Sequence, residues 1–95
     1  MDIPKTIRVG NRRYIIKIQH VDEPYTTGYT VDNLIVIASS NKTKHTTENE
    51  RALTFWHELT HAILHDMGEH QLNNRESFVE EFANRLARAI QTARF

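Results

Sequence analysis

The chain has 95 residues, which suits one compact domain spanning residues 1–95 and leaves little room for a second. Hydrophobic residues make up 39% and charged residues 25% of the chain, values that exclude a disordered or fibrous protein. The 12 Lys and Arg balance the 12 Asp and Glu, so the net charge indicates neither a nucleic-acid partner nor an anionic membrane. The absence of Cys excludes disulfides, a thiolate zinc site and a Cys nucleophile.

The N-terminal segment 1–5 lacks the apolar core of a signal peptide, and no apolar run approaches the length that spans a membrane. We therefore expect a cytoplasmic protein with no membrane partner. Any metal ion must be held by His, Asp or Glu side chains, because the chain offers no thiolate.

The first half of the chain predicts strands. Residues 12–20 alternate apolar and polar side chains with a period of two and one apolar exception, Ile15, as in a half-buried strand. Residues 28–31 and 34–38 lie on either side of Asp32-Asn33, a pair that tolerates positive φ and favours a two-residue hairpin. Residues 7–9, followed by a Gly-Asn pair, predict a further short strand. These elements indicate a small antiparallel sheet of three to four strands.

The second half predicts a long helix first. Thr47 and Glu50 have the spacing of a capping box, in which each side chain satisfies a free backbone N–H. The helix that they begin should end near Met67, with Gly68 as its left-handed stop.

A second long helix follows. Residues 69–74 are expected to form a loop, and Asn73 with Glu76 offers a cap for a helix that should end near Thr92. The whole pattern predicts an α+β fold, in which the N-terminal sheet packs on two long helices.

The sequence His57-Glu58-Leu59-Thr60-His61, inside the first predicted helix, carries the chemistry of the chain. Two His residues four apart lie about 40° from each other around a helix, so both imidazoles can reach one ion. Glu58 projects about 100° from His57, close enough to face a water beside the metal without ligating the metal. The composition gives about 0.03 chance matches to this pattern, so the surrounding residues have to support the interpretation.

The rest of this helix is apolar around most of its circumference. The apolar arc consists of Ala52, Phe55, Trp56, Leu59, Ala62, Ile63 and Met67, flanked by Leu53 and Leu64. The remaining arc holds Thr54, His57, Glu58, His61 and His65, without the Lys and Arg that a solvated helix face normally shows. We therefore expect a helix buried on most of its surface, with the motif as its polar strip.

A catalytic zinc needs a third protein ligand and an open position for water. His65 has rotated about 80° from His57 and risen two turns, which favours a place near the site over ligation. A third His six residues after His61 would indicate a metzincin, but that position is Met67, which excludes this class. A Glu from the second helix, packed antiparallel against the first, fits best. The candidates besides His65 are His70, Glu76, Glu80 and Glu81.

Segment 58–81 contains six acidic residues and one basic residue, Arg75. A dication would relieve the repulsion among these carboxylates. The same excess of negative charge makes this part of the surface unsuitable for a nucleic-acid backbone.

The run His57–His65, together with Phe78-Val79-Glu80-Glu81-Phe82-Ala83-Asn84, resembles the ImmA/IrrE family of zinc metallopeptidases, especially its short members from phages and mobile elements. The resemblance implies a minimal zincin-like domain that binds one Zn²⁺ per chain through His57 and His61, with Glu58 as the catalytic Glu. The acidic ligand of the family's second helix maps best onto Glu80. Asn84 occupies the place of an Asp or Asn that often follows one turn later. Residues 28–38 look like the strands beside the family's cleft.

The projection of the second helix separates its carboxylates. With Val79 at zero, Glu80 projects at about 100° and Glu76 at about 60°, both flanking an apolar face. Glu81 projects at about 200°, where it can pair with an Arg four residues on. We predict Glu80 as the third ligand, with Asn84 orienting a ligand, and Glu76 as a rival ligand or a residue of the cleft. The apolar face consists of Val79, Phe82, Ala83, Leu86 and Ile90.

These features predict a zinc-dependent metallopeptidase that hydrolyses peptide bonds, with Glu58 as the general base. An extended peptide could add to the sheet edge along residues 28–38 and so reach the metal. Tyr25, Tyr29 and His70 are candidate oxyanion partners, among which the sequence does not choose, and Tyr29 is also a candidate cleft residue. The expected partner is a protein or peptide substrate, such as a regulatory protein, and the expected state is a monomer.

A second interpretation is a zinc-stabilised binding module without catalytic activity, such as a phage protein that sequesters a host factor. The small size of the domain favours the module, because its cleft encloses little substrate. Glu58 favours the enzyme, because a structural site has no use for a general base. A metal-dependent hydrolase of another substrate, such as a nuclease, has less support, since those sites typically use carboxylates with magnesium.

Overall fold

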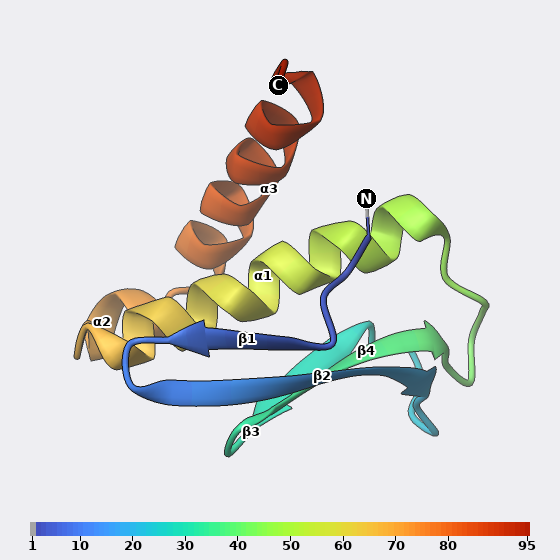
Figure 1. Cartoon of the computed structure of the whole chain (residues 1–95). Helices are drawn as coiled ribbons and strands as arrows, with labels where there is room; N and C mark the ends of the chain where they lie inside the picture. The colour runs from blue at the N-terminus through green and yellow to red at the C-terminus, as the bar shows by residue number, and fades with distance from the viewer. Residues whose placement is uncertain (1) are drawn as a thin grey trace.

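The chain forms a four-stranded sheet followed by three helices, as the computed structural model in Figure 1 shows. The structure describes residues 2–95, so Met1 lies outside the described part. The strands are β1 (Thr6–Val9), β2 (Arg12–His20), β3 (Gly28–Val31) and β4 (Leu34–Ser40). The helices are α1 (Glu48–Asp66), α2 (His70–Asn73) and α3 (Glu76–Thr92). The predicted α+β class is confirmed. None of the described helices is long and apolar enough to cross a lipid bilayer.

The strands lie in the order β1-β2-β4-β3. β1 pairs antiparallel with β2, and β3 with β4, whereas β2 and β4 pair parallel. The sheet is thus mostly antiparallel, as the sequence predicts, with one parallel pairing that the sequence does not indicate. That pairing arises because segment 21–27 carries the chain to the outer edge, so that the β3–β4 hairpin brings β4 back beside β2. β1 and β3 are therefore the edge strands.

Both tight turns of the sheet form where the sequence predicts them. Asp32 has φ 52°, and Val31 pairs with Leu34 across this two-residue turn. Gly10 has φ 59°, a left-handed conformation that costs glycine little.

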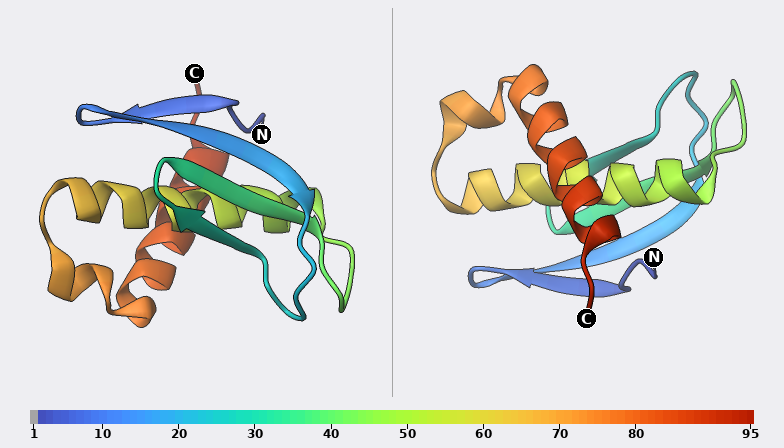
Figure 2. Two further views of the ribbon diagram at one scale, coloured as in Figure 1. Left: turned by 90° about the horizontal axis from the view of Figure 1, so that it is seen from below. Right: turned by 90° about the horizontal axis from the view of Figure 1, so that it is seen from above.

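α1 lies between the sheet and α3, so the molecule has three layers (Figure 2). One face of α1 packs on the sheet and forms the main core, in which Phe55 is 2% exposed. The core consists of Val9, Tyr14, Ile16, Ile35, Ile37, Phe55, Leu59 and Ala62. The expectation of a first helix buried on most of its surface is confirmed only in part, because eight residues of α1 are buried, whereas Leu53, Ile63 and Met67 of the predicted apolar surface are exposed.

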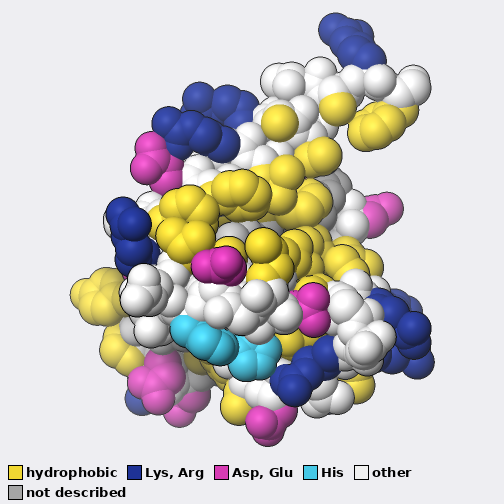
Figure 3. All heavy atoms as spheres, turned by 90° about the vertical axis from the view of Figure 1, so that its left-hand side faces the viewer, with side chains coloured by type: hydrophobic (Ala, Val, Ile, Leu, Met, Phe, Trp, Pro, Cys, Tyr) yellow, Lys and Arg dark blue, Asp and Glu magenta, His cyan; other side chains and the backbone are white. Residues whose placement is uncertain are grey.

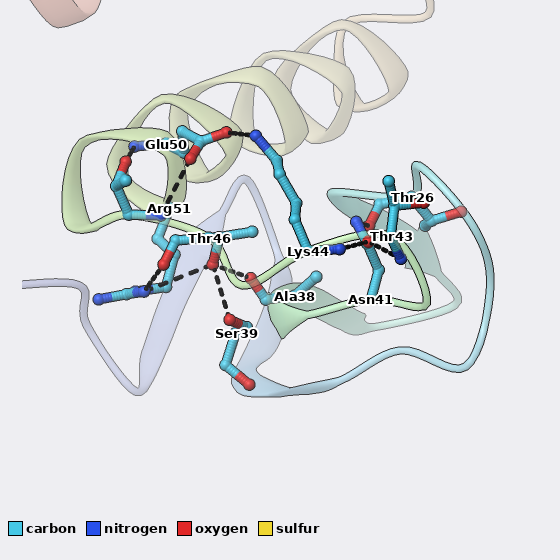
Figure 4. A network of polar contacts seen from close by, with 10 residues as sticks. Thr26, Ala38, Ser39, Asn41, Thr43, Lys44, Thr46, Glu50 and Arg51 are labelled. Atoms are coloured by element: carbon cyan, nitrogen blue, oxygen red, sulfur yellow. Dashed lines mark hydrogen bonds and ion pairs between the residues drawn. The ribbon is translucent and has the colours of Figure 1, made fainter.

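A network of hydrogen bonds fixes the start of α1 (Figure 4). Thr47 and Glu50 form the predicted capping box, in which the Thr47 hydroxyl accepts from the Glu50 N–H. The hydroxyl of Thr46 donates to the Ala38 carbonyl at the end of β4, which ties the helix to the sheet. Hydrogen bonds from the Lys44 ammonium and the Thr47 backbone hold the pKa of Glu50 below its ordinary value.

The connection between the long helices differs from the sequence expectation. Residues 69–74 contain the short helix α2 instead of a plain loop. The N-cap of α3 is Arg75, which makes no side-chain capping bond, so the prediction of an Asn73 cap is wrong. The Asn73 side chain contacts His61 on α1 instead.

α3 crosses α1 obliquely and does not lie along it (Figure 2). Its buried residues are Val79, Ala83 and Ala87, a line of small and medium side chains. Phe82 is 48% exposed and Ile90 is 40% exposed, so the predicted contact face is correct only in part. Because the helices cross, only one region of α3 comes close to the His pair of α1.

Gly28 allows β3 to lie directly against α1. A Cβ atom at this position would lie 2.5 Å from Thr54 Cγ2 and 2.7 Å from the Val36 carbonyl oxygen. Both separations are shorter than van der Waals contact, so any other residue would push the strand and the helix apart.

We predict that Gly28→Ala destabilises the fold by about 1–3 kcal/mol, the usual cost of overpacking. Thermal unfolding followed by circular dichroism should show a melting temperature lowered by several degrees or more. Thr27→Ala, at the exposed neighbouring position, is the control and should leave the melting temperature nearly unchanged. Equal melting temperatures for Gly28→Ala and wild type would contradict the close approach.

Candidate metal centre

Two imidazoles lie side by side on the polar strip of α1. His57 and His61 are four residues apart, one turn of the helix, and their ring centroids are 5.0 Å apart. Their side chains are 24% and 20% exposed, so both are accessible to an ion from solvent. The predicted pairing of these two side chains on one face is therefore present in the structure.

The carboxylate of Glu76, in the first turn of α3, completes a three-residue group with this pair. Its Oε2 lies 3.2 Å from His57 Nε2, and its Oε1 lies 2.9 Å from His61 Nε2. One ligand atom from each of the three residues can be chosen so that all lie within 4.8 Å of one another. Ligands of tetrahedral zinc, about 2.0–2.2 Å from the ion, lie roughly 3.3–3.5 Å from one another. The two distances from the Glu76 carboxylate to the imidazoles are slightly shorter than this spacing, and the other separations within the group are at most 4.8 Å.

Asn73 fixes the orientation and the tautomer of His61. Its Oδ1 lies 2.6 Å from His61 Nδ1, so the Nδ1–H donates to the amide oxygen. The neutral ring then carries a lone pair on Nε2, and this lone pair faces a Glu76 oxygen, which is also an acceptor. Two acceptors at 2.9 Å repel each other unless a cation lies between them or the ring gains a second proton. The donor set therefore suits a bound cation.

Glu58 lies next to the His pair without belonging to the group. It is 7% exposed, and its Oε1 accepts a hydrogen bond of 2.7 Å from the Thr30 hydroxyl of β3. Thr30 faces α1 because it pairs with Ile35, a residue of the core between sheet and helix. The second carboxylate oxygen has no hydrogen bond within residues 2–95, so it is free to contact water.

A cleft of about 580 Å³ opens beside these residues, between β3, α1 and α3. Its lining residues are Thr27, Gly28, Tyr29, Thr30, Glu50, Leu53, Thr54, His57, Glu58, Glu76, Glu80, Ala83 and Asn84. In the space-filling view of Figure 3, histidine side chains reach the surface, and a broad band of apolar side chains lies above them. The cleft is thus bounded on one side by an edge strand and is lined by Glu58 and by two residues of the three-residue group, His57 and Glu76.

The structure places Glu76, and not Glu80, against the two imidazoles. Glu80 and Asn84 line the cleft one and two turns further along α3, and their side chains make no hydrogen bond or ion pair within the described residues. The prediction of Glu80 as the third ligand stays a prediction, and the arrangement of these side chains favours its rival Glu76. The reason is the oblique crossing of α3, which brings only its first turn to the His pair.

The other residues singled out in the sequence lie around the cleft. Tyr29 lines it and is 39% exposed, while Tyr25 is 80% exposed and does not line it. His65 and His70 contact each other, with ring centroids 6.1 Å apart, and neither belongs to the three-residue group. Glu81 pairs with Arg85 at 2.7 Å, which confirms that it points away from the site.

Two residues of the site escape prediction from the sequence. Thr30 could have been found from its place in the hairpin, since its register with Ile35 puts it on the helix side of an edge strand. The sequence indicates Asn73 only as a helix cap, because an Asn three residues before a Glu is typical of a cap. No local pattern predicts its contact with His61, which lies 12 residues away in the chain.

No protein-family model, curated protein or solved structure matches this chain. The resemblance described above therefore remains a prediction from the motif residues, and the geometry of the site has to support the function by itself.

We predict that Glu76→Gln weakens zinc binding by at least about tenfold, because it removes the charge of the third ligand. Glu80→Gln should change the affinity less than about twofold, since its carboxylate lies outside the group. Competition with a chromophoric chelator measures both constants. Glu81→Gln serves as the matched control, because this carboxylate pairs with Arg85 on the surface. A larger loss from Glu80→Gln than from Glu76→Gln would restore Glu80 as the ligand.

Proposed function

We propose that this protein is a zinc-dependent metallopeptidase. The observation that carries the proposal is the convergence of His57, His61 and Glu76 beside the buried carboxylate of Glu58. Two imidazoles and one carboxylate form a donor set of catalytic zinc sites, which leave one position open. The general base stands outside this set, as hydrolysis requires.

Zn²⁺ held by these residues would polarise a water molecule and the carbonyl of a substrate peptide. Glu58 takes a proton from the attacking water and later delivers it to the leaving amine. The hydroxyl of Thr30 occupies one oxygen of this carboxylate, so the other oxygen is the one that handles the proton. Thr30 thereby keeps the base in a single orientation.

The substrate in this proposal is an extended peptide that adds to the free edge of β3. β3 is an edge strand, and its first three residues, together with Thr27 just before it, line the cleft. Backbone pairing with such an edge accepts any sequence in extended form and leaves specificity to the side-chain pockets. A peptide on the edge of β3 passes the His pair, because Gly28 of β3 packs against Thr54, in the turn of α1 just before His57.

Glu58 and Thr30 favour the enzyme over a zinc-stabilised binding module. A structural site gains nothing from a carboxylate that is buried, hydrogen-bonded at one oxygen and free at the other. The protein or peptide substrate, the cytoplasmic location and the monomeric state expected from the sequence remain part of the proposal.

Glu58→Gln tests the function directly. The variant keeps the shape of the side chain but removes the base, so zinc should stay bound while peptidase activity falls at least about a hundredfold. Metal content by mass spectrometry and cleavage of a proteome-derived peptide library measure the two quantities. One zinc per chain with no cleavage by the wild type would favour the binding module, and no zinc in the wild type would remove both interpretations.

Thr30→Val and Thr30→Ser test the orientation of the base. Valine has nearly the shape of threonine but no hydroxyl, so the rate of turnover should fall about tenfold or more while the Michaelis constant and zinc affinity change little. Serine keeps the hydroxyl and should retain most of the rate. Equal rates for the Val variant and the wild type would show that the hydrogen bond to Glu58 has no part in turnover.

A further inference from the structure

The second half of β2 has an open edge. β1 pairs with β2 only across residues 12–15, and the N–H of Ile16 donates to the Lys5 carbonyl at 2.9 Å. Beyond this bond, no strand among residues 2–95 lies on that side of β2. Successive N–H groups of a strand point to opposite edges, so the N–H groups of Ile18 and His20 face the same open edge as that of Ile16.

A cavity of about 850 Å³ lies along this edge, and we call it the β2 groove. Ile18 is 48% exposed and Ile15 is 44% exposed, which is unusual for large apolar side chains in the middle of a strand. The groove is lined by Ile3, Pro4, Lys5, Thr6, Arg13, Ile15, Ile16, Lys17, Ile18 and Asn33.

The charged side chains of the β2 groove are all cationic. Lys5, Arg13 and Lys17 line it, and no Asp or Glu does. None of the three forms an ion pair within the described part of the chain. Their charge is therefore available to an external anion.

The two faces of β2 differ along the groove. Ile16 and Ile18 point to the helix side, whereas Ile15, beside the end of β1, and Lys17, beside the open edge, point to the outer side of the sheet, because successive side chains alternate. A strand added here would place every second side chain against apolar surface and the others beside Lys17. The groove therefore fits a peptide in which apolar and acidic residues alternate.

We propose that the β2 groove binds an extended segment of a partner protein, with alternating apolar and acidic residues, as a fifth strand of the sheet. The open backbone groups of β2 supply the hydrogen bonds, and the cations select the charge. This interaction surface is separate from the cleft beside β3 and does not depend on the peptidase proposal.

A second copy of this chain fits the groove poorly. Pairing two β2 edges would bring Lys17 of one copy near the cations of the other, and like charges across a strand pair are unfavourable. Lysines on an edge strand disfavour pairing with a second copy of the same strand. They favour a strand with acidic side chains, because opposite charges across a strand pair attract. A nucleic acid would match the cations but neither the apolar lining nor the free strand edge.

The proposal can be tested with acetyl-Glu-Val-Glu-Ile-Glu-Val-Glu-amide as the probe. Nuclear magnetic resonance titration of the Glu58→Gln protein, which avoids cleavage of the probe, measures its affinity. We expect saturable binding, with the amide protons of Ile18 and His20 at least tenfold slower to exchange in the complex. The analogue with Lys in place of every Glu should bind at least tenfold more weakly.

Peptides methylated on alternate backbone nitrogens test the strand geometry. One set of alternate N–H groups points to β2 and the other to solvent, so one methylated peptide should lose at least tenfold in affinity while the other keeps it. Equal effects of the two methylation patterns would overturn the strand addition.

Charge-reversal variants test whether the cations of the β2 groove select acidic peptides. We expect Lys17→Glu to weaken binding of the acidic probe at least tenfold and to strengthen binding of the Lys analogue. Lys5→Glu replaces this variant if Lys17→Glu folds poorly. Arg88→Glu makes the same change of net charge on α3, outside the groove, and should leave both affinities unchanged. No binding of the acidic probe at millimolar concentration would overturn the proposal, as would tighter binding of a 20-base-pair DNA duplex without protection of Ile18.

Discussion

The packing of α1 between the sheet and α3 is the constraint on which the candidate site depends. Apolar contact on both sides buries most of the helix and leaves a narrow polar strip with His57, Glu58 and His61. The sheet lies on one side of this strip and α3 on the other. The side chains that contact the strip therefore come from the parts of these two layers that lie nearest to it. α3 supplies Glu76, and β3 supplies Thr30. The site is thus formed at the junction of three layers, and no single element contains it.

The register of β3 along α1 follows from simple dimensions. Two strand residues advance about 6.6 Å, and four helix residues advance about 6.0 Å, so contacts two apart on the strand match contacts four apart on the helix. Gly28 lies against Thr54, and Thr30 bonds to Glu58 four residues later. The close approach at Gly28 therefore determines whether the Thr30 hydroxyl reaches Glu58, so we expect a substitution there to affect the candidate site as well as stability.

Local signals in the sequence predict the elements well. The capping box at Thr47, the turn at Asp32 and the stop at Gly68, which has φ 73°, each depend on residues close in the chain, and each is present. The carboxylate that lies beside the His pair depends on the crossing of two helices, which no short pattern encodes. A projection around α3 can show that Glu76 and Glu80 share a flank, but only tertiary packing decides which of them touches the His pair. The parallel pairing of β2 with β4 and the contact of Asn73 with His61 escape prediction for the same reason.

The net charge of the chain is zero, but its positive and negative residues are concentrated in different segments. Residues 3–20 contain five cations and no acid, whereas residues 58–81 contain six acids and one cation. The separation falls on the two open edges of one sheet: cations line the groove along β2, and the carboxylates of Glu58, Glu76 and Glu80 line the cleft along β3. Backbone pairing alone does not distinguish peptides, so the charge beside each edge has to do so. In the two proposals, an acidic strand would be attracted to the β2 edge and repelled from the β3 edge, so the same small sheet would hold two different extended peptides without competition between them.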